Sequence, residues 1–182
     1  MPERVERCQR RNYYRIGTSS LSLPQVDVWP LLDPKSVMLA ERACELDHAS
    51  ATKGQPAAPT DVGDVAIRPE LGPQFAATLL NIGGGGIGLA VSSTHAGALA
   101  NHKLFWLRFG LTPELSLPVC ATAKLAHTHI QPDHHTYAGL SFDFTWNPGH
   151  QRFVIDRICR YIALRPVSYT HLRSHETCLD LV

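Results

Sequence analysis

The sequence predicts a mainly β protein, a small antiparallel β-barrel with a C-terminal α-helix and an inserted loop/helix region. Three observations lead to this fold class. Short runs of alternating or apolar residues, bounded by glycine, proline and polar residues, recur along most of the chain, as expected for strands. One amphipathic stretch follows the last of these runs. The repeated strand–helix–strand pattern of a parallel sheet does not occur in the sequence.

The first predicted strand covers residues 21–29, where apolar and polar side chains alternate and Pro24 suggests a sheet edge or a bulge. Residues 36–46 then place apolar side chains at roughly helical spacing. Residues 51–64 are rich in Ala, Pro, Gly and Thr, which is typical of a linker or a surface insertion. We therefore expect an insertion at about residues 34–68, between the first strand and the rest of the barrel.

The remaining strands are predicted in the second half of the chain, at 74–80, 87–91, 104–111, 117–130 and 136–144. The first two flank a turn that runs from Asn81 to Gly86. The Ala-rich residues 93–103 favour one short helix. The last two strands are separated by residues 131–135, which indicates a hairpin and hence antiparallel pairing.

A helix is predicted after the last strand, because Asn147 can cap it and Pro148 fits its first turn. Its apolar residues recur at spacings of three and four: Val154, Ile155, Ile158, Tyr161 and Ile162. Arg152, Asp156 and Arg160 lie on the opposite side. The apolar stripe must pack against the sheet, so we expect this helix to close one end or one edge of the barrel.

Length and composition are those of one soluble domain. The chain has 182 residues and a formal net charge of +1. Residues 167–182 resemble a translated sequencing adapter, and we set them aside as non-native. The domain organisation is therefore an arginine-rich arm at 1–16, a barrel domain at 17–166 and this tail. Apart from the cysteine in this tail, the chain has four cysteines, and they show no CxxC spacing. The sequence has no signal peptide and no apolar run long enough to span a bilayer. A cytoplasmic protein with reduced thiols is the simplest interpretation.

The N-terminal arm concentrates positive charge, with arginines at positions 4, 7, 10, 11 and 15. Such a cluster needs an anionic partner or open solvent. A solvated basic terminus or a nonspecific nucleic-acid patch is the alternative to a specific site.

The glycine run permits two interpretations. Gly83, Gly85 and Gly88 satisfy the dinucleotide-binding fingerprint GxGxxG. However, residues 87–91 read as strand where that fingerprint needs a helix, and the sequence has no acidic residue between Glu70 and Glu114. The second interpretation is a turn between antiparallel strands, where glycines let a ligand approach main-chain N–H groups.

The turn interpretation brings a family resemblance. The spacing of Asn81, Gly83 and Gly86 resembles the [D/N]-x-S-x-x-G motif of the PilZ domain family, with Gly83 in place of the usual Ser. Upstream, Arg11 and Arg15 resemble the family's R-x-x-x-R motif. The segment 137–142 and the helix from about residue 150 resemble the final strand and terminal helix of these domains, so the resemblance covers most of residues 7–164.

The resemblance implies a receptor for cyclic di-GMP, a ligand with two phosphodiester anions and two guanines. It implies that Arg11 and Arg15 grip the ligand, with Arg10 as an auxiliary cation. The arginine fork matches both phosphate and the O6/N7 edge of guanine. Asn81 would address a guanine edge, and the run of Gly83, Gly84, Gly85 and Gly86 would let the backbone approach the ligand.

The sequence offers little support for a metal site or for enzyme chemistry. His127 and His129 share one face of a predicted strand, with Asp133, His134 and His135 nearby, but no evident ligand set completes a metal site. The sequence shows no nucleophile elbow, Walker lysine or HExxH helix, so no enzyme is predicted. Trp29, Trp106 and Trp146 are expected in core and edge packing.

The expected function is that of a cyclic di-GMP-binding receptor or effector domain in bacterial signalling, without a cofactor. Its output is expected through a protein partner or a fused domain, without DNA or RNA and without a membrane span. The alternative is a degenerate PilZ-like interaction module that binds no nucleotide, made plausible by the hydroxyl that Gly83 lacks.

Overall fold

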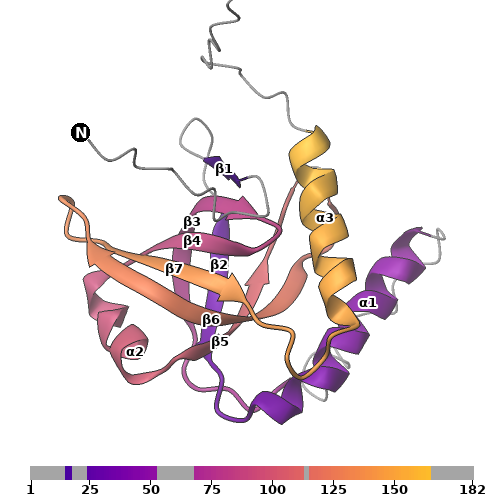
Figure 1. Ribbon diagram of the computed structural model, residues 1–182, viewed down its shortest axis with the longest axis horizontal. Helices are drawn as coiled ribbons and strands as arrows, with labels where there is room; N and C mark the ends of the chain where they lie inside the picture. Colours follow the sequence, from indigo (N-terminus) through magenta and orange to yellow (C-terminus); the bar gives the residue numbers. More distant parts are fainter. Residues whose placement is uncertain (1–14, 18–23, 53–67, 113–114, 165–182) are drawn as a thin grey trace, which may run out of the picture.

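The computed structural model describes residues 15–17, 24–52, 68–112 and 115–164, with residues 15–17 described for their backbone alone. The elements, in chain order, are β1 (Arg15–Gly17), β2 (Gln25–Pro30), the 3-10 helix η1 (Pro34–Ser36), α1 (Val37–Thr52), β3 (Phe75–Gly83), β4 (Gly86–Val91), the 3-10 helix η2 (Ser93–His95), α2 (Ala96–Asn101), β5 (Leu104–Phe109), β6 (Val119–Ile130), β7 (Thr136–Phe142) and α3 (His150–Leu164) (Figure 1).

Six of these strands close into a barrel. Their cyclic order is β3, β2, β5, β6, β7, β4 and back to β3, and every pairing is antiparallel. The strand β1 pairs with residues 81–83 of β3, on the edge that β2 occupies at residues 75–78. Closure leaves no long unpaired edge among these strands. The predicted fold class, an antiparallel β-barrel with a C-terminal helix, is confirmed.

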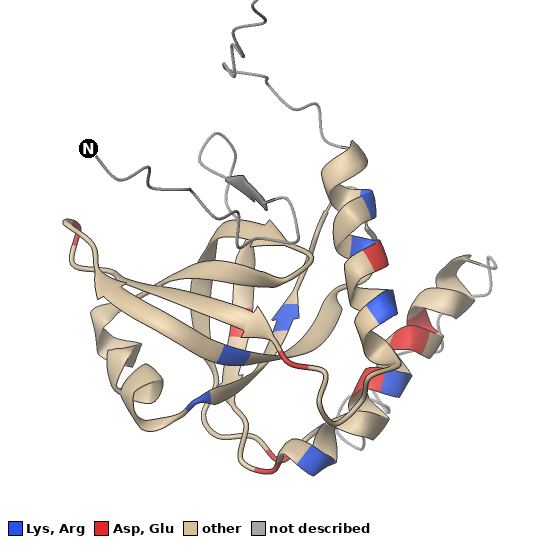
Figure 2. Ribbon diagram, viewed as in Figure 1, with Lys and Arg blue, Asp and Glu red and all other residues tan. Residues whose placement is uncertain are grey.

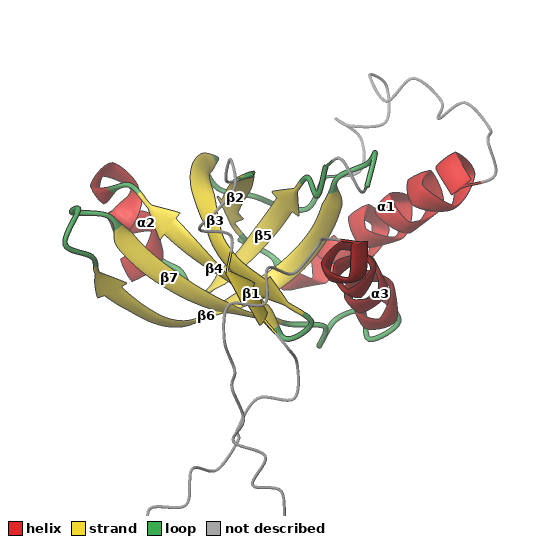
Figure 3. Ribbon diagram, turned by 90° about the horizontal axis from the view of Figure 1, so that it is seen from above, coloured by secondary structure: helices red, strands yellow, loops and turns green. Residues whose placement is uncertain are grey.

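The barrel core follows the strand period of two. Inward side chains are apolar and fully buried, as for Leu79, Ile87 and Phe105. The predicted stripe of α3 joins this core through Val154, Ile158 and Tyr161. Figure 3 shows α3 and α1 at one end of the barrel and α2 at the other, and Leu99 of α2 also belongs to the core cluster. The expectation that the terminal helix closes one end is met.

The helix α1 lies in the region predicted as an insertion and packs on the outside of the barrel. A second apolar cluster joins it to β2 and β5 through Trp29, Leu31, Val37, Ala40 and Trp106. Trp29 and Trp106 lie directly opposite one another in neighbouring strands. Both are buried, as the sequence predicts, whereas Trp146 lies at an exposed position 5.8 Å from Lys35 Nζ.

Several boundaries differ from the prediction. The helix α1 continues to Thr52, six residues beyond the predicted end, because buried Cys44 and His48 hold its later turns on the barrel. The predicted helix 93–103 is divided into η2 and α2. The predicted turn 81–86 is shorter, because Gly83 and Gly86 pair with each other across β3 and β4. Ladder hydrogen bonds need only backbone groups, so glycine does not end a strand here.

Candidate ligand-binding face

The pairing of strands brings distant residues into one row on the barrel wall. Asn81 pairs with Gly17 of β1 and with Gly88 of β4. Gly139 of β7 pairs with Gly88 and with His127 of β6. The first row therefore reads Gly17, Asn81, Gly88, Gly139 and His127 across five strands.

A second row lies two residues further along each of β1, β3, β4 and β7. Gly83 pairs with Arg15 and with Gly86, Gly86 pairs with Ser141, and Ser141 pairs with Lys124. The residues between the rows, such as Ile82, Ile87 and Leu140, are buried in the barrel core. The two rows thus belong to the outer face of β3, β4 and β7.

Two β-bulges set this alignment. The register shifts between Leu79 and Asn81 in β3, and between Leu125 and His127 in β6. Each extra residue changes which side chains face outward beyond that point. The bulges therefore place Asn81 and His127 at the two sides of the same glycine-rich patch, which we call the glycine floor: Gly17, Gly83, Gly86, Gly88 and Gly139.

Two glycines of the floor allow neighbouring side chains to lie very close to the backbone. A Cβ atom at Gly88 would stand 2.6 Å from the Tyr137 hydroxyl oxygen and 2.8 Å from Asn81 Cγ. A Cβ at Gly139 would stand 2.8 Å from Nδ1 and from Nε2 of His127. Since real Cβ contacts are longer, these two glycines let polar side chains lie directly on the backbone.

Asn81 has an incomplete set of hydrogen bonds. Its Nδ2 donates to the Tyr137 hydroxyl oxygen at 3.2 Å. Its Oδ1 is buried and accepts no hydrogen bond within the described part of the chain. A buried acceptor without a donor costs about 1–3 kcal/mol. An N–H or O–H group that reached this oxygen would remove that cost.

Three of the strands that carry the floor have no charged side chains. β3, β4 and β7 contain no Lys, Arg, Asp or Glu. Figure 2 shows the charges of the described residues mainly on α1, α3 and the loops, with Lys124 on the neighbouring β6. An anion on the floor would have to be neutralised by cations outside these three strands, such as Lys124.

The predicted site residues are partly brought together. Arg15 lies in β1 opposite Gly83, and Asn81 lies in the next row, so one residue of each predicted motif lies on the same strand pair. Gly84 and Gly85 form the turn between β3 and β4. Arg10 and Arg11 lie outside the described residues.

Other residues of this face were not assigned to it from the sequence: Tyr137, Gly139, Ser141, Lys124 and the pair His127 and His129. His127 and His129 do share one face, with ring planes 7° apart. Within the described ranges, no group of three or more His, Cys, Asp or Glu is arranged to hold a metal ion. These residues can be assigned to this face only from the strand register. The register cannot be deduced from the sequence where bulges shift it.

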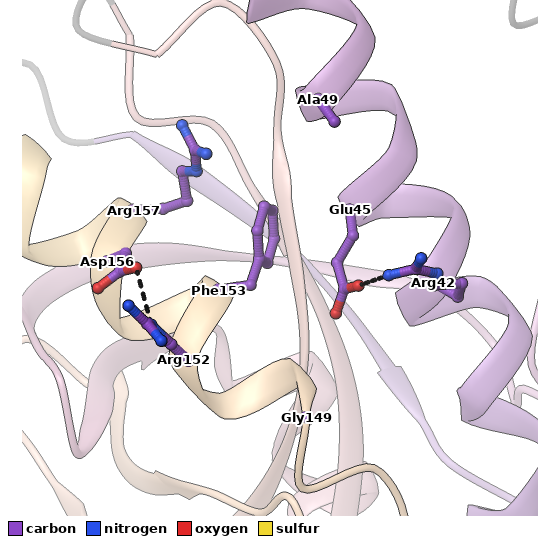
Figure 4. Close-up of a pocket in the computed structure, with 8 residues that line it drawn as sticks. All are labelled: Arg42, Glu45, Ala49, Gly149, Arg152, Phe153, Asp156 and Arg157. Carbon is purple, nitrogen blue, oxygen red and sulfur yellow. Dashed lines mark hydrogen bonds and ion pairs between the residues drawn. The ribbon is translucent and has the colours of Figure 1, made fainter.

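A groove of about 380 Å³ lies elsewhere, between α1 and α3 (Figure 4). Its arginines are largely neutralised within it: Arg42 Nη1 lies 2.6 Å from Glu45 Oε2, and Arg152 Nε lies 3.9 Å from Asp156 Oδ2. The Arg157 guanidinium carbon lies 5.3 Å from the centroid of the Phe153 ring. None of the predicted site residues that the structure describes lines this groove, and its charges are mixed in sign.

Buried polar groups fasten α1 to β6 and α3. Thr122 Oγ1 donates to Glu41 Oε1 at 3.0 Å, and burial raises the pKa of Glu41. The fully buried His150 ring contacts Glu45 Oε1 and the Cys120 carbonyl oxygen, each at 2.9 Å. Hydrogen bonds from Cys120 and His48, stronger together than the effect of burial, lower the pKa of the Cys44 thiol to about 5. These contacts position helices and lie apart from the glycine floor.

The chain matches no protein-family model and no curated protein sequence. It is similar to solved structures at low sequence identity. The inhibitor of motility MotI/DgrA of Bacillus subtilis is 16% identical, with a TM-score of 0.47 over 90% of this chain and 57% of that one. The chain thus spans little more than half of the MotI/DgrA length.

Two further structures are similar over most of their length. The PilZ domain of YcgR from Escherichia coli with c-di-GMP is 12% identical, with a TM-score of 0.43 over 85% of this chain and 93% of that chain. A tetrameric PilZ domain from Xanthomonas campestris, assembled through a helical bundle, is 13% identical, with a TM-score of 0.43 over 86% and 93%. Within the described residues, no helix is long and apolar enough to cross a membrane.

Proposed function

We propose that this chain is a cyclic di-GMP-binding receptor domain, with the ligand on the glycine floor between Arg15 and Asn81. The observation that carries the proposal is the strand register, which places Arg15 opposite Gly83 and Asn81 one row away. Arg15 of one motif and Asn81 of the other, more than sixty residues apart in the sequence, thereby lie in adjacent cross-strand rows.

The unpartnered oxygen of Asn81 suits a guanine base. Guanine offers N–H donors on the edge that carries its N2 amino group, and acceptors at O6 and N7. Asn81 Oδ1 is a buried acceptor without a donor among the described residues. A guanine N–H directed at this oxygen would remove the cost of that unmade hydrogen bond.

The phosphodiester anions would be matched by cations from the sides of the floor. Arg15 belongs to β1, and Lys124 lies at the far end of the same row. Arg11 would grip the ligand together with Arg15, and Arg10 would be an auxiliary cation; both precede β1 in the sequence. Arginine suits this role because its planar fork binds phosphate and the guanine O6/N7 edge in a bidentate manner.

The proposed activity is binding without a chemical step. A ligand held by both Arg15 and the barrel connects the N-terminal segment to the wall formed by β3, β4 and β7. Binding would then change the surface that this side of the molecule presents to a neighbouring domain or a protein partner.

Calorimetric titration of the full chain with cyclic di-GMP tests the proposal. We expect saturable binding that weakens for Arg15→Ala by about 1.5–3 kcal/mol, the cost of a hydrogen-bonded charged group. Arg160→Ala, which removes an exposed arginine from α3, is the matched control and should bind like the wild type.

Cyclic di-AMP serves as the ligand control, because it has the same phosphate ring but lacks guanine O6. We expect it to bind much more weakly than cyclic di-GMP. Wild-type affinity in Arg15→Ala would show that Arg15 does not grip the ligand. Absence of both heat and thermal-shift stabilisation with cyclic di-GMP at high micromolar concentration would refute the receptor function.

A second candidate function is a nucleotide-independent interaction module. Gly83 lacks the hydroxyl that the resembling motif carries, and α1 exposes Met38, Leu39 and Leu46, with Leu39 74% exposed. An exposed apolar helix face of this kind suits contact with another protein. This candidate would be favoured if the titrations above show no nucleotide binding while the chain remains folded.

A further inference from the structure

Three rings form an ordered layer beside the glycine floor. His127 and His129 of β6 and Tyr137 of β7, which we call the ring layer, are nearly parallel. The centroids of His129 and Tyr137 are 4.6 Å apart with planes at 22°, and those of His127 and Tyr137 are 5.6 Å apart at 30°.

The ring layer is seated on the glycine floor. The His127 ring lies over Gly139, and the Tyr137 hydroxyl lies over Gly88 and accepts the Asn81 hydrogen bond. Gly88 and Gly139 are buried, whereas both imidazoles are exposed. The His127 ring and the Tyr137 hydroxyl are therefore held against the backbone, while His127 and His129 are exposed to solvent.

We propose that the ring layer is a stacking surface for one guanine of the dinucleotide, so that the β6–β7 hairpin forms the second wall of the site. This inference rests on the proposed function and assigns it residues beyond the two motifs. Base stacking on aromatic rings is strong for every base, because every base has a π face. Nearly parallel, seated rings also lose little freedom when a base stacks on them.

The position of the ring layer fits a ligand with two bases. Tyr137 and His129 face each other in the row next to the one that holds Asn81 and His127. Three strand spacings of about 4.8 Å separate β3 from β6, which is about 14 Å across the floor. The Tyr137 hydroxyl spans part of this distance, because it accepts the Asn81 hydrogen bond at 3.2 Å. A base at Asn81 and a base on the His127 and His129 rings would therefore lie on opposite sides of Tyr137 in the strand order.

Substitutions on β6 test the ring layer in the full chain, again by titration with cyclic di-GMP. We expect the double variant His127→Ala with His129→Ala to bind about tenfold to a hundredfold more weakly than the wild type. His129→Phe should keep most of the affinity, since it preserves stacking, and His129→Leu should lose it. Thr128→Ala is the matched control. Thr128 is exposed on the same strand, and it pairs with Ala138 between the two histidine pairs, so its side chain belongs to the opposite face of the sheet.

Gly139→Ala provides an independent test that leaves every ring in the sequence. Its Cβ would displace the His127 ring, which can swing outward because it is exposed. We expect weaker binding without a loss of thermal stability.

If the wild type binds cyclic di-GMP and the double variant binds it with the same affinity, the ring layer is not a stacking surface. The receptor function would still stand in that case. Equal loss in His129→Phe and His129→Leu would also contradict stacking, since the imidazole itself would then be required. Absence of binding by the wild-type chain would refute the receptor function and this inference with it.

Discussion

At the scale of single residues, the candidate site depends on glycines, because they allow other groups to approach the backbone closely. The floor combines glycines that permit close contact, such as Gly88 under Tyr137, with one glycine packed directly against a neighbouring strand. A Cβ at Gly86 would collide with the carbonyl oxygen of Leu140 and approach the Ser141 Cα at 3.1 Å. Side chains over Gly88 and Gly139 can move, but the β7 backbone beside Gly86 cannot move without breaking its ladder with β4.

Gly86→Ala is therefore expected to destabilise the fold by about 2 kcal/mol or more, because the added methyl group meets backbone in a closed barrel. The free energy of unfolding by urea measures the effect. Gly97→Ala is the matched control: its Cβ would meet nothing within 4 Å, and it lies inside α2. Replacing a helical glycine by alanine should stabilise by about 0.5–1 kcal/mol, and equal effects of the two substitutions would contradict this account.

At the scale of elements, α3 serves as the closing element of the barrel. Val154, Ile158 and Tyr161 are fully buried in the core, whereas Ile155 on the same helix is half-buried. Its first residue, His150, is tied to α1 by Glu45 and to β6 by the Cys120 carbonyl. The helix is thus held both by apolar packing and by a buried polar contact at its start.

Ile158→Ala is expected to cost about 2–5 kcal/mol of stability, because it leaves a cavity at the closed end of the barrel. Ile155→Ala removes the same atoms from a less buried position and should cost clearly less. Thermal or urea unfolding of both variants makes the comparison, and a similar loss in the two would show that α3 does not close the core as described.

Acid should weaken the contact between α1 and α3. Burial alone would raise the pKa of Glu45, but hydrogen bonds from His150 and Arg42 outweigh it and hold the pKa below its ordinary value of 4.5. A depressed carboxyl pKa contributes stability that is present above that ordinary value and is lost as the pH falls through the lower, folded-state pKa.

The free energy of unfolding of the wild type should therefore decrease as the pH falls below about 4.5, and Glu45→Gln should show a shallower decrease. Urea unfolding at a series of pH values measures both slopes. Parallel pH profiles for the wild type and Glu45→Gln would remove Glu45 from the account of acid stability.

At the scale of the whole molecule, the charged helices and the uncharged barrel wall are separate regions. α1, α3 and the groove between them hold mixed charges, whereas β3, β4 and β7 hold none. Figure 1 shows β1 beside β3 at one side of this wall and the β6–β7 hairpin extending along it. A ligand on the wall would therefore touch elements from both ends of the sequence.

Amide hydrogen exchange can test this location directly. With cyclic di-GMP bound, we expect slower exchange in β1, in the β3–β4 turn and in β7, and unchanged exchange in α1. Slowing confined to α1 and α3 would place the ligand in the groove instead of on the glycine floor.

The local features of this protein were determined by the sequence alone. Strand and helix periods and the run from Gly83 to Gly86 act over a few residues, so they predicted the barrel, the terminal helix and the turn. The predicted cap at Asn147 did not mark the start of that helix, which begins at His150. The length of α1 was not predictable, because Glu41, Cys44 and His48 are polar or small residues whose burial depends on β6 and its preceding loop.

Only the tertiary structure decided which residues share the candidate face. A shift of one residue turns every later side chain of a strand to the opposite side, and two bulges make such shifts in β3 and β6. The sequence indicated Asn81, the glycines and Arg15 as residues of a site. Their alignment with Gly139, Tyr137 and His127 depends on pairing between strands far apart in the chain, and no local pattern encodes that pairing.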